Sequence, residues 1–288
     1  MRMLDYTVPP EFHGRTVKFC LKHGLGLSDG AVSRIRWQTA GVTVNGDFAR
    51  MTAVVRTGDV LTVPVGDLRP GGAFVPADIP VDVLFEDEDL FILNKPAGLA
   101  VHGRSEKGDA TLGAALAARY GTDAVFHPVN RLDKDTSGVM AVARSGYIHD
   151  RLRRMLHSPD FCREYLAVTV GAPGCGRVDA PLGKVGPGWK QGVCPGGKPA
   201  VTAFETLKTC DGLALVRCVP ETGRTHQIRA HLAYLGCPLA GDRLYGTADD
   251  RIGRQALHAW RMRLTHPVTG VVLDVSAELP EDMKRLVP

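Results

Sequence analysis

The sequence predicts an α+β protein with a large body and a small N-terminal module. Helical and strand-like segments are mixed along the chain, without the regular alternation that marks a doubly wound parallel sheet. A stretch rich in proline and glycine, residues 64–80, is typical of a linker. Of the 288 residues, 44% are hydrophobic, which suffices for an ordinary globular core. We therefore expect a module over 1–66, a linker over 67–79 and a body over 80–288.

The N-terminal module should hold two helices followed by a small sheet. The spacing of apolar residues predicts a short helix over 16–22 and a second helix that Ser28 or Asp29 caps. This second helix would carry Arg34 and Arg36 on its exposed side. Strands are expected at residues 42–44, 51–55 and 60–63. The Asn-Gly pair after the first of these strands is a strong signal for a hairpin turn.

The positive charge of the chain is concentrated in this module. The net charge is +4 overall, yet residues 13–56 carry seven lysines and arginines against two aspartates. Such a cluster indicates a surface for a polyanion, although charge alone does not separate RNA from DNA or from a role in solubility. The two helices, the small sheet and the basic second helix resemble the αL RNA-binding module of ribosomal proteins and several RNA-modifying enzymes. This resemblance implies that Arg34 and Arg36 contact RNA.

The body should alternate irregularly between strands and helices. The acidic residues 86–89 lie between two predicted strands, and we expect them to form a solvated turn. A helix near the C-terminal third should begin around Thr225 and place Ile228, Leu232 and Leu235 toward the core. The other predicted elements are strands at 81–85, 90–93, 139–143 and 165–170, and helices at 111–120 and 148–156.

Composition argues against several classes of protein. No apolar run is long enough to cross a membrane, and the N-terminus lacks the apolar stretch of a signal peptide, so we expect a cytoplasmic protein. The seven cysteines are scattered without a Cys-x-x-Cys pair, so we expect reduced thiols and no zinc site. His226 and His231 are five residues apart, whereas two metal-binding histidines on a helix would be four apart.

Residues 131–141 are the segment most informative about function. Asp133 precedes Asp135, Thr136 and Ser137, which can each bond to nearby backbone, and then Gly138, which can adopt the left-handed conformation of a tight turn. A buried strand follows. A carboxylate on a loop held by a strand is well placed for chemistry. The segment alone leaves open a plain alternative, a surface turn in which the aspartate caps its own backbone.

Four segments resemble, in the same order, the RluA-type family of pseudouridine synthases. They are residues 83–102, 127–138, 163–171 and 221–260, and the likeness covers nearly all of 80–275. The resemblance implies a central mixed, mainly antiparallel sheet flanked by helices. It also implies an enzyme that isomerises uridine in RNA with neither metal nor other cofactor. One position departs from the family, since Asn130 stands where the catalytic segment usually has histidine.

The resemblance also implies a role for individual residues. Asp133 would be the carboxylate that acts at the ribose, and Arg229 the positive partner that a carboxylate in a pocket needs. Tyr165 would stack under the uracil and help to remove the proton from its carbon 5. Arg131 would lie near the flipped nucleotide and Arg163 near a phosphate. Plain alternatives remain open, because arginines are mostly exposed and a strand tyrosine commonly serves packing.

We expect the RNA to be large-subunit ribosomal RNA, with transfer RNA second, and the protein to be a monomer. An alternative in another class is an inactive RNA-binding or ribosome-assembly factor that kept the fold. A nucleoside hydrolase or base-excising glycosylase is a further alternative, and either one would release free base.

Overall fold

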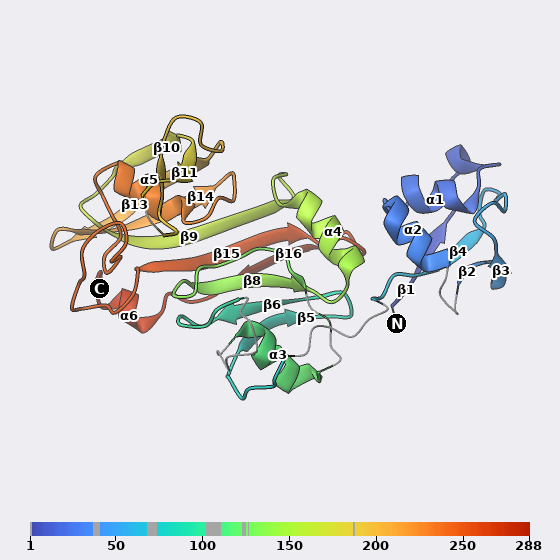
Figure 1. The fold of residues 1–288 in the computed structure, drawn as a ribbon, viewed down its shortest axis with the longest axis horizontal. Coiled ribbons are helices and arrows are strands. Elements are labelled where there is room, and N and C mark those ends of the chain that lie inside the picture. Colours follow the sequence, from blue (N-terminus) through green and yellow to red (C-terminus); the bar gives the residue numbers. More distant parts are fainter. Residues whose placement is uncertain are drawn as a thin grey trace.

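The structure is a computed structural model that describes residues 2–36, 41–67, 74–101, 111–122, 125, 127–186 and 188–288, with only the backbone of Arg36. A ten-stranded sheet and a four-stranded sheet dominate it, and helices lie against both (Figure 1). The predicted α+β class is confirmed. No helix in the described ranges is long and apolar enough to span a bilayer.

The four-stranded sheet belongs to the N-terminal module and has the order β1-β4-β2-β3. Its strands are β1 Met3–Thr7, β2 Val42–Val44, β3 Asp47–Ala49 and β4 Val60–Pro64, and its helices are η1 Pro10–Phe12, α1 Val17–His23 and α2 Asp29–Arg36. Both predicted helices are present. The Thr16 hydroxyl caps α1 by accepting from the Phe19 amide at 3.3 Å, and the Ser28 hydroxyl accepts from the Ala31 amide at 3.2 Å at the start of α2.

Two features of this sheet differ from the prediction. The hairpin after Val44 is present, but its second strand is β3 at 47–49 and not the predicted 51–55, because a two-residue turn brings the partner strand back at once. Residues 51 and 53 instead offer their carbonyls to the backbone amides at the start of α1. The sequence also gave no sign of β1, which pairs antiparallel with β4.

The ten-stranded sheet has the order β10-β13-β14-β9-β15-β8-β6-β5, with β16 beside β15 and β7 beside β8. Its one parallel pair among the described strands is β15 with β8, so the sheet is mixed and mainly antiparallel as expected. The strands are β5 Asp82–Glu86, β6 Leu90–Lys95, β7 His127–Pro128, β8 Ser137–Ala143, β9 Phe161–Val170, β10 Cys175–Asp179, β13 Val201–Cys210, β14 Leu213–Pro220, β15 Leu257–Thr265 and β16 Val272–Ser276. The remaining elements are α3 Leu112–Tyr120, α4 Gly146–Met155, α5 Gln227–Tyr234, α6 Glu281–Lys284 and the hairpin β11 Leu182–Lys184 with β12 Gln191–Val193.

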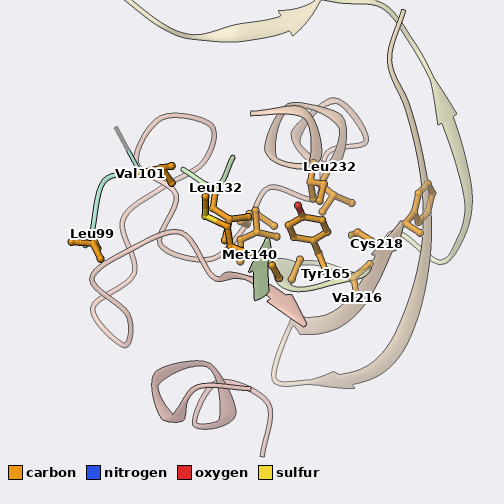
Figure 2. Packing of buried hydrophobic residues seen from close by; sticks show 14 of the residues in the cluster. Leu99, Val101, Leu132, Met140, Tyr165, Val216, Cys218 and Leu232 are labelled. Atoms are coloured by element: carbon orange, nitrogen blue, oxygen red, sulfur yellow. The ribbon is translucent and has the colours of Figure 1, made fainter. Parts of the chain in front are cut away.

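Strand β9 is covered on both faces. Tyr165 belongs to a cluster with Leu232 of α5 (Figure 2), while Val168 on the opposite face packs with Met283 of α6. Alternation along the strand could not reveal this, because the covering elements come from distant parts of the chain. Leu235 follows the last residue of α5 and is 38% exposed, so its predicted core position is wrong.

The acidic turn between β5 and β6 is not simply a solvated tip. Asp89 is 3% exposed, and its carboxylate accepts from Nε and NH2 of Arg2 at 3.0 and 3.2 Å. The carboxylate of Asp87 accepts from two backbone amides of the turn. The prediction fails here because a partner 87 residues away neutralises the buried charge.

The N-terminal module lies beyond the end of the large sheet that carries α4 (Figure 1). The Tyr147 side chain of α4 packs against the module core, and its hydroxyl donates to the Leu25 carbonyl at 3.2 Å. Arg151 donates to the same carbonyl at 3.4 Å. Asp67, at the start of the predicted linker, accepts from the Gly146 amide at 3.0 Å. These contacts hold the module against α4. Residues 68–73 of the predicted linker lie outside the described residues, so the prediction cannot be compared there.

Candidate active site

The loop that joins β7 to β8 carries Asp133 at a cleft of ≈ 820 Å³. Leu132 is buried in the main hydrophobic core and anchors the loop to it, whereas the Asp133 side chain remains 28% exposed. The Asp133 carbonyl accepts from the Thr136 amide at 3.0 Å, which closes a turn. The loop therefore presents one carboxylate to the cleft while its neighbour packs inward.

Gly138 lets β8 approach β15 closely behind this loop. Its φ is +113°, and a Cβ atom there would lie 2.1 Å from the carbonyl oxygen of Ala259. Residues 137 and 138 form the parallel contact with β15 at this point. A side chain at 138 would push the two strands apart, so the predicted need for glycine is confirmed with a further reason, the closeness of the neighbouring backbone.

Side chains just before β15 and at its start hold the turn after Asp133. The Thr136 and Ser137 hydroxyls contact these distant side chains, so the prediction that they bond to nearby backbone is wrong for these two residues. The contacts join the Asp135 carbonyl to Arg254 NH1 at 3.1 Å, the Thr136 hydroxyl to Gln255 Nε2 at 3.3 Å and the Ser137 hydroxyl to His258 Nδ1 at 2.9 Å. The turn is thus fixed by residues about 120 positions later in the chain.

The buried side chain of Lys95 supports the loop that carries Asp133. Its side chain is fully buried, and Nζ donates to the carbonyls of Pro96, Leu99 and Lys134 at 2.8 to 3.0 Å. Burial lowers the pKa of Lys95 to about 8. Nζ donates to all three of these carbonyls, so Lys95 joins the end of β6 to the loop that carries Asp133.

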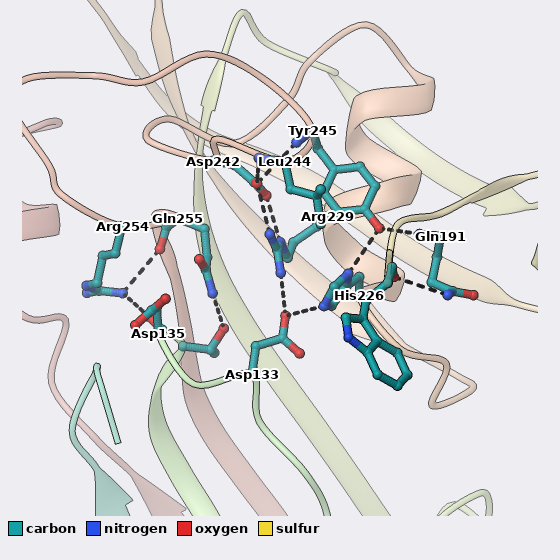
Figure 3. Close-up of polar contacts among 12 residues, drawn as sticks. Asp133, Asp135, Gln191, His226, Arg229, Asp242, Leu244, Tyr245, Arg254 and Gln255 are labelled. Atoms are coloured by element: carbon teal, nitrogen blue, oxygen red, sulfur yellow. Dashed lines mark hydrogen bonds and ion pairs between the residues drawn. The ribbon is translucent and has the colours of Figure 1, made fainter. Parts of the chain in front are cut away.

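Asp133 is ion-paired with Arg229, as predicted (Figure 3). The guanidinium NH1 donates to Asp133 Oδ2 at 2.9 Å, while Nε and NH2 form a fork on Asp242 at 2.7 and 2.9 Å. Burial opposes the charge of Arg229, but the hydrogen bonds to Asp242 and Asp133 outweigh it and raise the pKa of Arg229 above its ordinary value. The Asp242 side chain is completely buried and also accepts from the amides of Leu244 and Tyr245. Arg229 is thus locked in one orientation and is not on a solvated helix side.

Tyr165 lines the cleft from strand β9 and is 7% exposed. Burial raises the pKa of its phenol, so the side chain is neutral near pH 7. Its ring packs among the core residues (Figure 2). The position therefore combines a packing role with access to the cleft, and the two alternatives stated for this residue are not exclusive.

The rim of the cleft is cationic. Arg131 is exposed at the cleft, and Arg163 lines it with a buried Nε that has no hydrogen-bond partner among the described residues. Arg153 and Arg224 line it as well. Arg34 is exposed on α2 of the module and is not one of the cleft residues, and the side chain of Arg36 lies outside the described residues.

Asn130 has a structural contact at the position where the family usually has histidine. It is 4% exposed, and its Oδ1 accepts from the Ala141 amide at 3.0 Å, which ties the loop to β8. Its Nδ2 is buried and has no partner in the described part of the chain. Asn130 therefore supports the loop by hydrogen bonding and does not titrate.

Three polar residues near Asp133 were not among the predicted site residues. Asp242 lies within the resembling segment 221–260, but nothing in the sequence pairs it with Arg229. His226 lines the cleft with Nε2 3.9 Å from Asp133 Oδ2, and Tyr245 contacts the same histidine at 3.1 Å. The sequence offered one signal for His226. It is a histidine, a residue type common at active sites, and it lies between Thr225 and Gln227 in the resembling segment.

Within the described ranges, the group with metal-ligand spacing is Asp87, Asp89 and His266, and none of these residues lines the cleft. Most of the oxygen and nitrogen atoms that could bind a metal already form hydrogen bonds within the protein. Arg2 binds both oxygens of Asp89, and Nδ1 of His266 accepts from the amides of Val268 and Thr269. These contacts explain the cluster without an ion.

Comparisons with known proteins identify the family of the chain. Residues 89–234 match the model of the family described as RNA pseudouridylate synthase. The chain is 35% identical to the uncharacterized RNA pseudouridine synthase YjbO of Bacillus subtilis over 91% of this chain and 95% of that protein. It is 36% identical to ribosomal large subunit pseudouridine synthase D of Yersinia pestis, over 85% and 82% of the two chains. The solved structure of human RNA pseudouridylate synthase domain containing 4 is 27% identical and superposes with a TM-score of 0.57 over 70% of this chain and 90% of that one. On this evidence the chain belongs to the RluA-type family of RNA pseudouridine synthases, enzymes that isomerise uridine within RNA.

Proposed function

We propose that Asp133 is the residue that acts on the ribose of the target uridine. The observation that carries this proposal is the ion pair with Arg229 at 2.9 Å, which holds a partly exposed carboxylate at the cleft in one orientation. When the bond between N1 of uracil and C1′ breaks, its electron pair leaves with the uracil and the sugar develops positive charge. A carboxylate at that point can form a bond to C1′, or take the 2′ proton to leave a glycal.

The product contains the same atoms as the substrate. The uracil turns within the cleft, and its carbon 5 forms a bond to C1′ as the bond to Asp133 breaks or as the glycal takes back its 2′ proton. Carbon 5 then loses its proton, and N1 takes up a proton. We assign Tyr165, which lines the cleft from β9, to contact the uracil face, and its hydroxyl to assist that proton loss. These reaction steps need a carboxylate, a cleft wall that binds the base, and a cleft that excludes water.

The cationic rim is suited to the RNA backbone. Arg163 lines the cleft, and its guanidinium is suited to charge-assisted hydrogen bonds with a phosphate oxygen. Arg131, two residues before Asp133 and exposed, would fill the space that the flipped nucleotide leaves.

We propose large-subunit ribosomal RNA as the substrate, with transfer RNA as the second candidate. Several relatives carry the name ribosomal large subunit pseudouridine synthase D. The basic module over 1–66 would bind a structured part of that RNA through Arg34 and Arg36, while 80–288 would perform the chemistry, with the protein acting as a monomer and in the cytoplasm.

The test uses total RNA from a strain that lacks this protein. The purified protein is incubated with that RNA, and pseudouridine is mapped chemically in parallel for the wild type and for Asp133→Asn. We expect new sites in ribosomal RNA with the wild type and none with the variant. New sites confined to transfer RNA would overturn the substrate, and activity of Asp133→Asn would overturn the role of the carboxylate. Free uracil would instead indicate a glycosylase, and binding without any pseudouridine an inactive factor.

A further inference from the structure

We propose that His226 is a second catalytic residue, whose Nε2–H donates a hydrogen bond to the uracil while the uracil leaves the ribose. This inference rests on the proposed role of Asp133. It is carried by the backbone of His226, by the contacts that fix its tautomer and by its place beside the carboxylate.

The backbone of His226 is strained. Its φ and ψ are 55° and 22°, the left-handed conformation, at the N-cap of α5. A residue with a Cβ atom pays roughly 1–2 kcal/mol for this conformation. The side chain gives no capping hydrogen bond in return. It lies in the cleft wall instead, and strain of this kind at a cleft commonly accompanies function.

Tyr245 fixes which ring nitrogen of His226 carries the proton (Figure 3). The Tyr245 oxygen accepts from the Gln191 amide at 2.9 Å and lies 3.1 Å from His226 Nδ1. A partly buried hydroxyl hydrogen needs an acceptor, and among the described residues Nδ1 is the one in contact with it. The hydroxyl therefore donates to Nδ1, and the proton of the neutral imidazole is on Nε2.

The proton on Nε2 faces the place where the reaction occurs. Nε2 lies 3.9 Å from Asp133 Oδ2, which is too long for a hydrogen bond, and that oxygen already accepts from Arg229 at 2.9 Å. Among the described residues, Nε2 has no hydrogen-bond acceptor. The donor is therefore free for a ligand whose reacting carbon touches Asp133.

Burial keeps His226 neutral despite the two carboxylates near it. Burial lowers the pKa of His226 below its ordinary value. Asp133 and Asp242 act in the opposite direction, while Arg229 acts with burial. Tyr245 faces Nδ1 as a neutral phenol, because burial raises its pKa. A neutral donor at Nε2 is thus the form that a substrate meets near pH 7.

The leaving uracil needs such a donor. When the N1–C1′ bond breaks, the electron pair spreads over N1 and the carbonyl oxygens of the base. A hydrogen bond to this developing charge stabilises the transition state more than the ground state, where the base is neutral. No proton is transferred, so the uracil stays nucleophilic at carbon 5 for the second bond. The histidine would hold the anion and release it when carbon 5 reacts.

The experiment compares two substrates that differ in the leaving group. The target uridine of a short RNA is replaced by 5-fluorouridine, whose fluorine stabilises the uracil anion without help from the protein. The rate of loss of the original nucleoside is measured in single turnover after digestion and chromatography. The main variant is His226→Asn, because asparagine tolerates the left-handed backbone but is too short to replace the imidazole.

We expect His226→Asn to slow the reaction of uridine by about 100-fold, the usual cost of one such donor, and that of 5-fluorouridine by about 10-fold or less. Tyr245→Phe should also slow the reaction of uridine more than that of 5-fluorouridine, but by a smaller factor. This variant keeps the histidine but no longer fixes which of its ring nitrogens carries the proton. Equal slowing of both substrates would assign His226 to loop structure, and unchanged rates would leave it without a role. Either result overturns the inference.

Asp133→Asn separates this inference from the proposal on which it rests. It should abolish loss of both nucleosides. If it retains activity, the role of Asp133 fails whatever His226 does. Circular dichroism and RNA affinity measured for each variant exclude unfolding as the cause of a lost rate.

Discussion

Replacement of Arg229 by lysine should damage catalysis far more than RNA binding. The guanidinium makes three hydrogen bonds, two to Asp242 and one to Asp133, all between 2.7 and 2.9 Å. A lysine ammonium is a compact charge that cannot form the fork and reach the second carboxylate as well. Asp242 is completely buried whereas Asp133 is 28% exposed, so the ammonium should remain with Asp242 and Asp133 should lose its partner.

The expected magnitudes follow from these contacts. Breaking a buried ion pair costs about 3–5 kcal/mol, and the retained charge should reduce the loss for Arg229→Lys to about 2–4 kcal/mol of unfolding free energy. An active-site donor is worth about 100- to 1000-fold in kcat, and we expect a loss in this range. RNA affinity should change less than about threefold, because Arg229 is almost wholly buried and offers the RNA little surface.

Arg251→Lys is the matched control. Arg251 forms the same fork on Asp249, at 2.9 and 2.7 Å, but its side chain is 53% exposed. Exposed ion pairs contribute about 0–1 kcal/mol, so this variant should keep its stability and its kcat. Single-turnover rates with saturating RNA, together with RNA titration and denaturant unfolding, give the three quantities. Wild-type kcat in Arg229→Lys, or an affinity loss as large as the loss of kcat, would refute the reasoning.

Three further predictions concern the cleft and its support. Tyr165→Phe should retain most activity if stacking is its whole role, and a loss of kcat at unchanged RNA affinity would show that the hydroxyl takes part. Arg131→Ala should slow the reaction in structured RNA more than in an unpaired oligonucleotide, and equal losses on the two substrates would contradict its role in the vacated stack. Lys95→Met should destabilise the protein by about 1–3 kcal/mol, because three inward carbonyls lose their donor. The lysine pKa is lowered from 10.5 to about 8, so the wild type should gain stability as pH rises between these values, and urea unfolding across that range should show no such gain in the methionine variant.

The roles of Asp133 and Arg229 were predicted from the resemblance of their segments to the RluA-type family. The residues alone indicate only a carboxylate in a turn before a buried strand, and although a carboxylate in a pocket needs a positive partner, it is the resemblance that assigns this role to Arg229. Asp242 could not be assigned, because its contact with Arg229 depends on how the loop after α5 folds back. The same holds for Lys95, whose burial looks improbable until three carbonyls are seen to surround it.

In the fold, too, features set by neighbouring residues could be predicted, whereas contacts between distant parts of the chain could not. Both helices of the module and the Asn-Gly turn were predicted, since caps and turns are encoded within a few residues. The pairing of β1 with β4 joins residues about 57 positions apart, and no local signal specifies it. The second buried face of β9 likewise depends on α5 and α6, which come much later in the chain.

The arrangement around Asp133 explains why a second polar group is needed for the chemistry. In ordinary glycoside hydrolysis one carboxyl group protonates the leaving group while another acts at the sugar. Asp133 is ion-paired with Arg229 and is therefore suited to act at the sugar, not to donate a proton. Protonation would also be counterproductive, because a neutral uracil reacts less readily through carbon 5 than its anion. A neutral hydrogen-bond donor resolves both requirements, since it lowers the energy of the departing anion without quenching it. His226, with its proton directed to Nε2 by Tyr245, has this property.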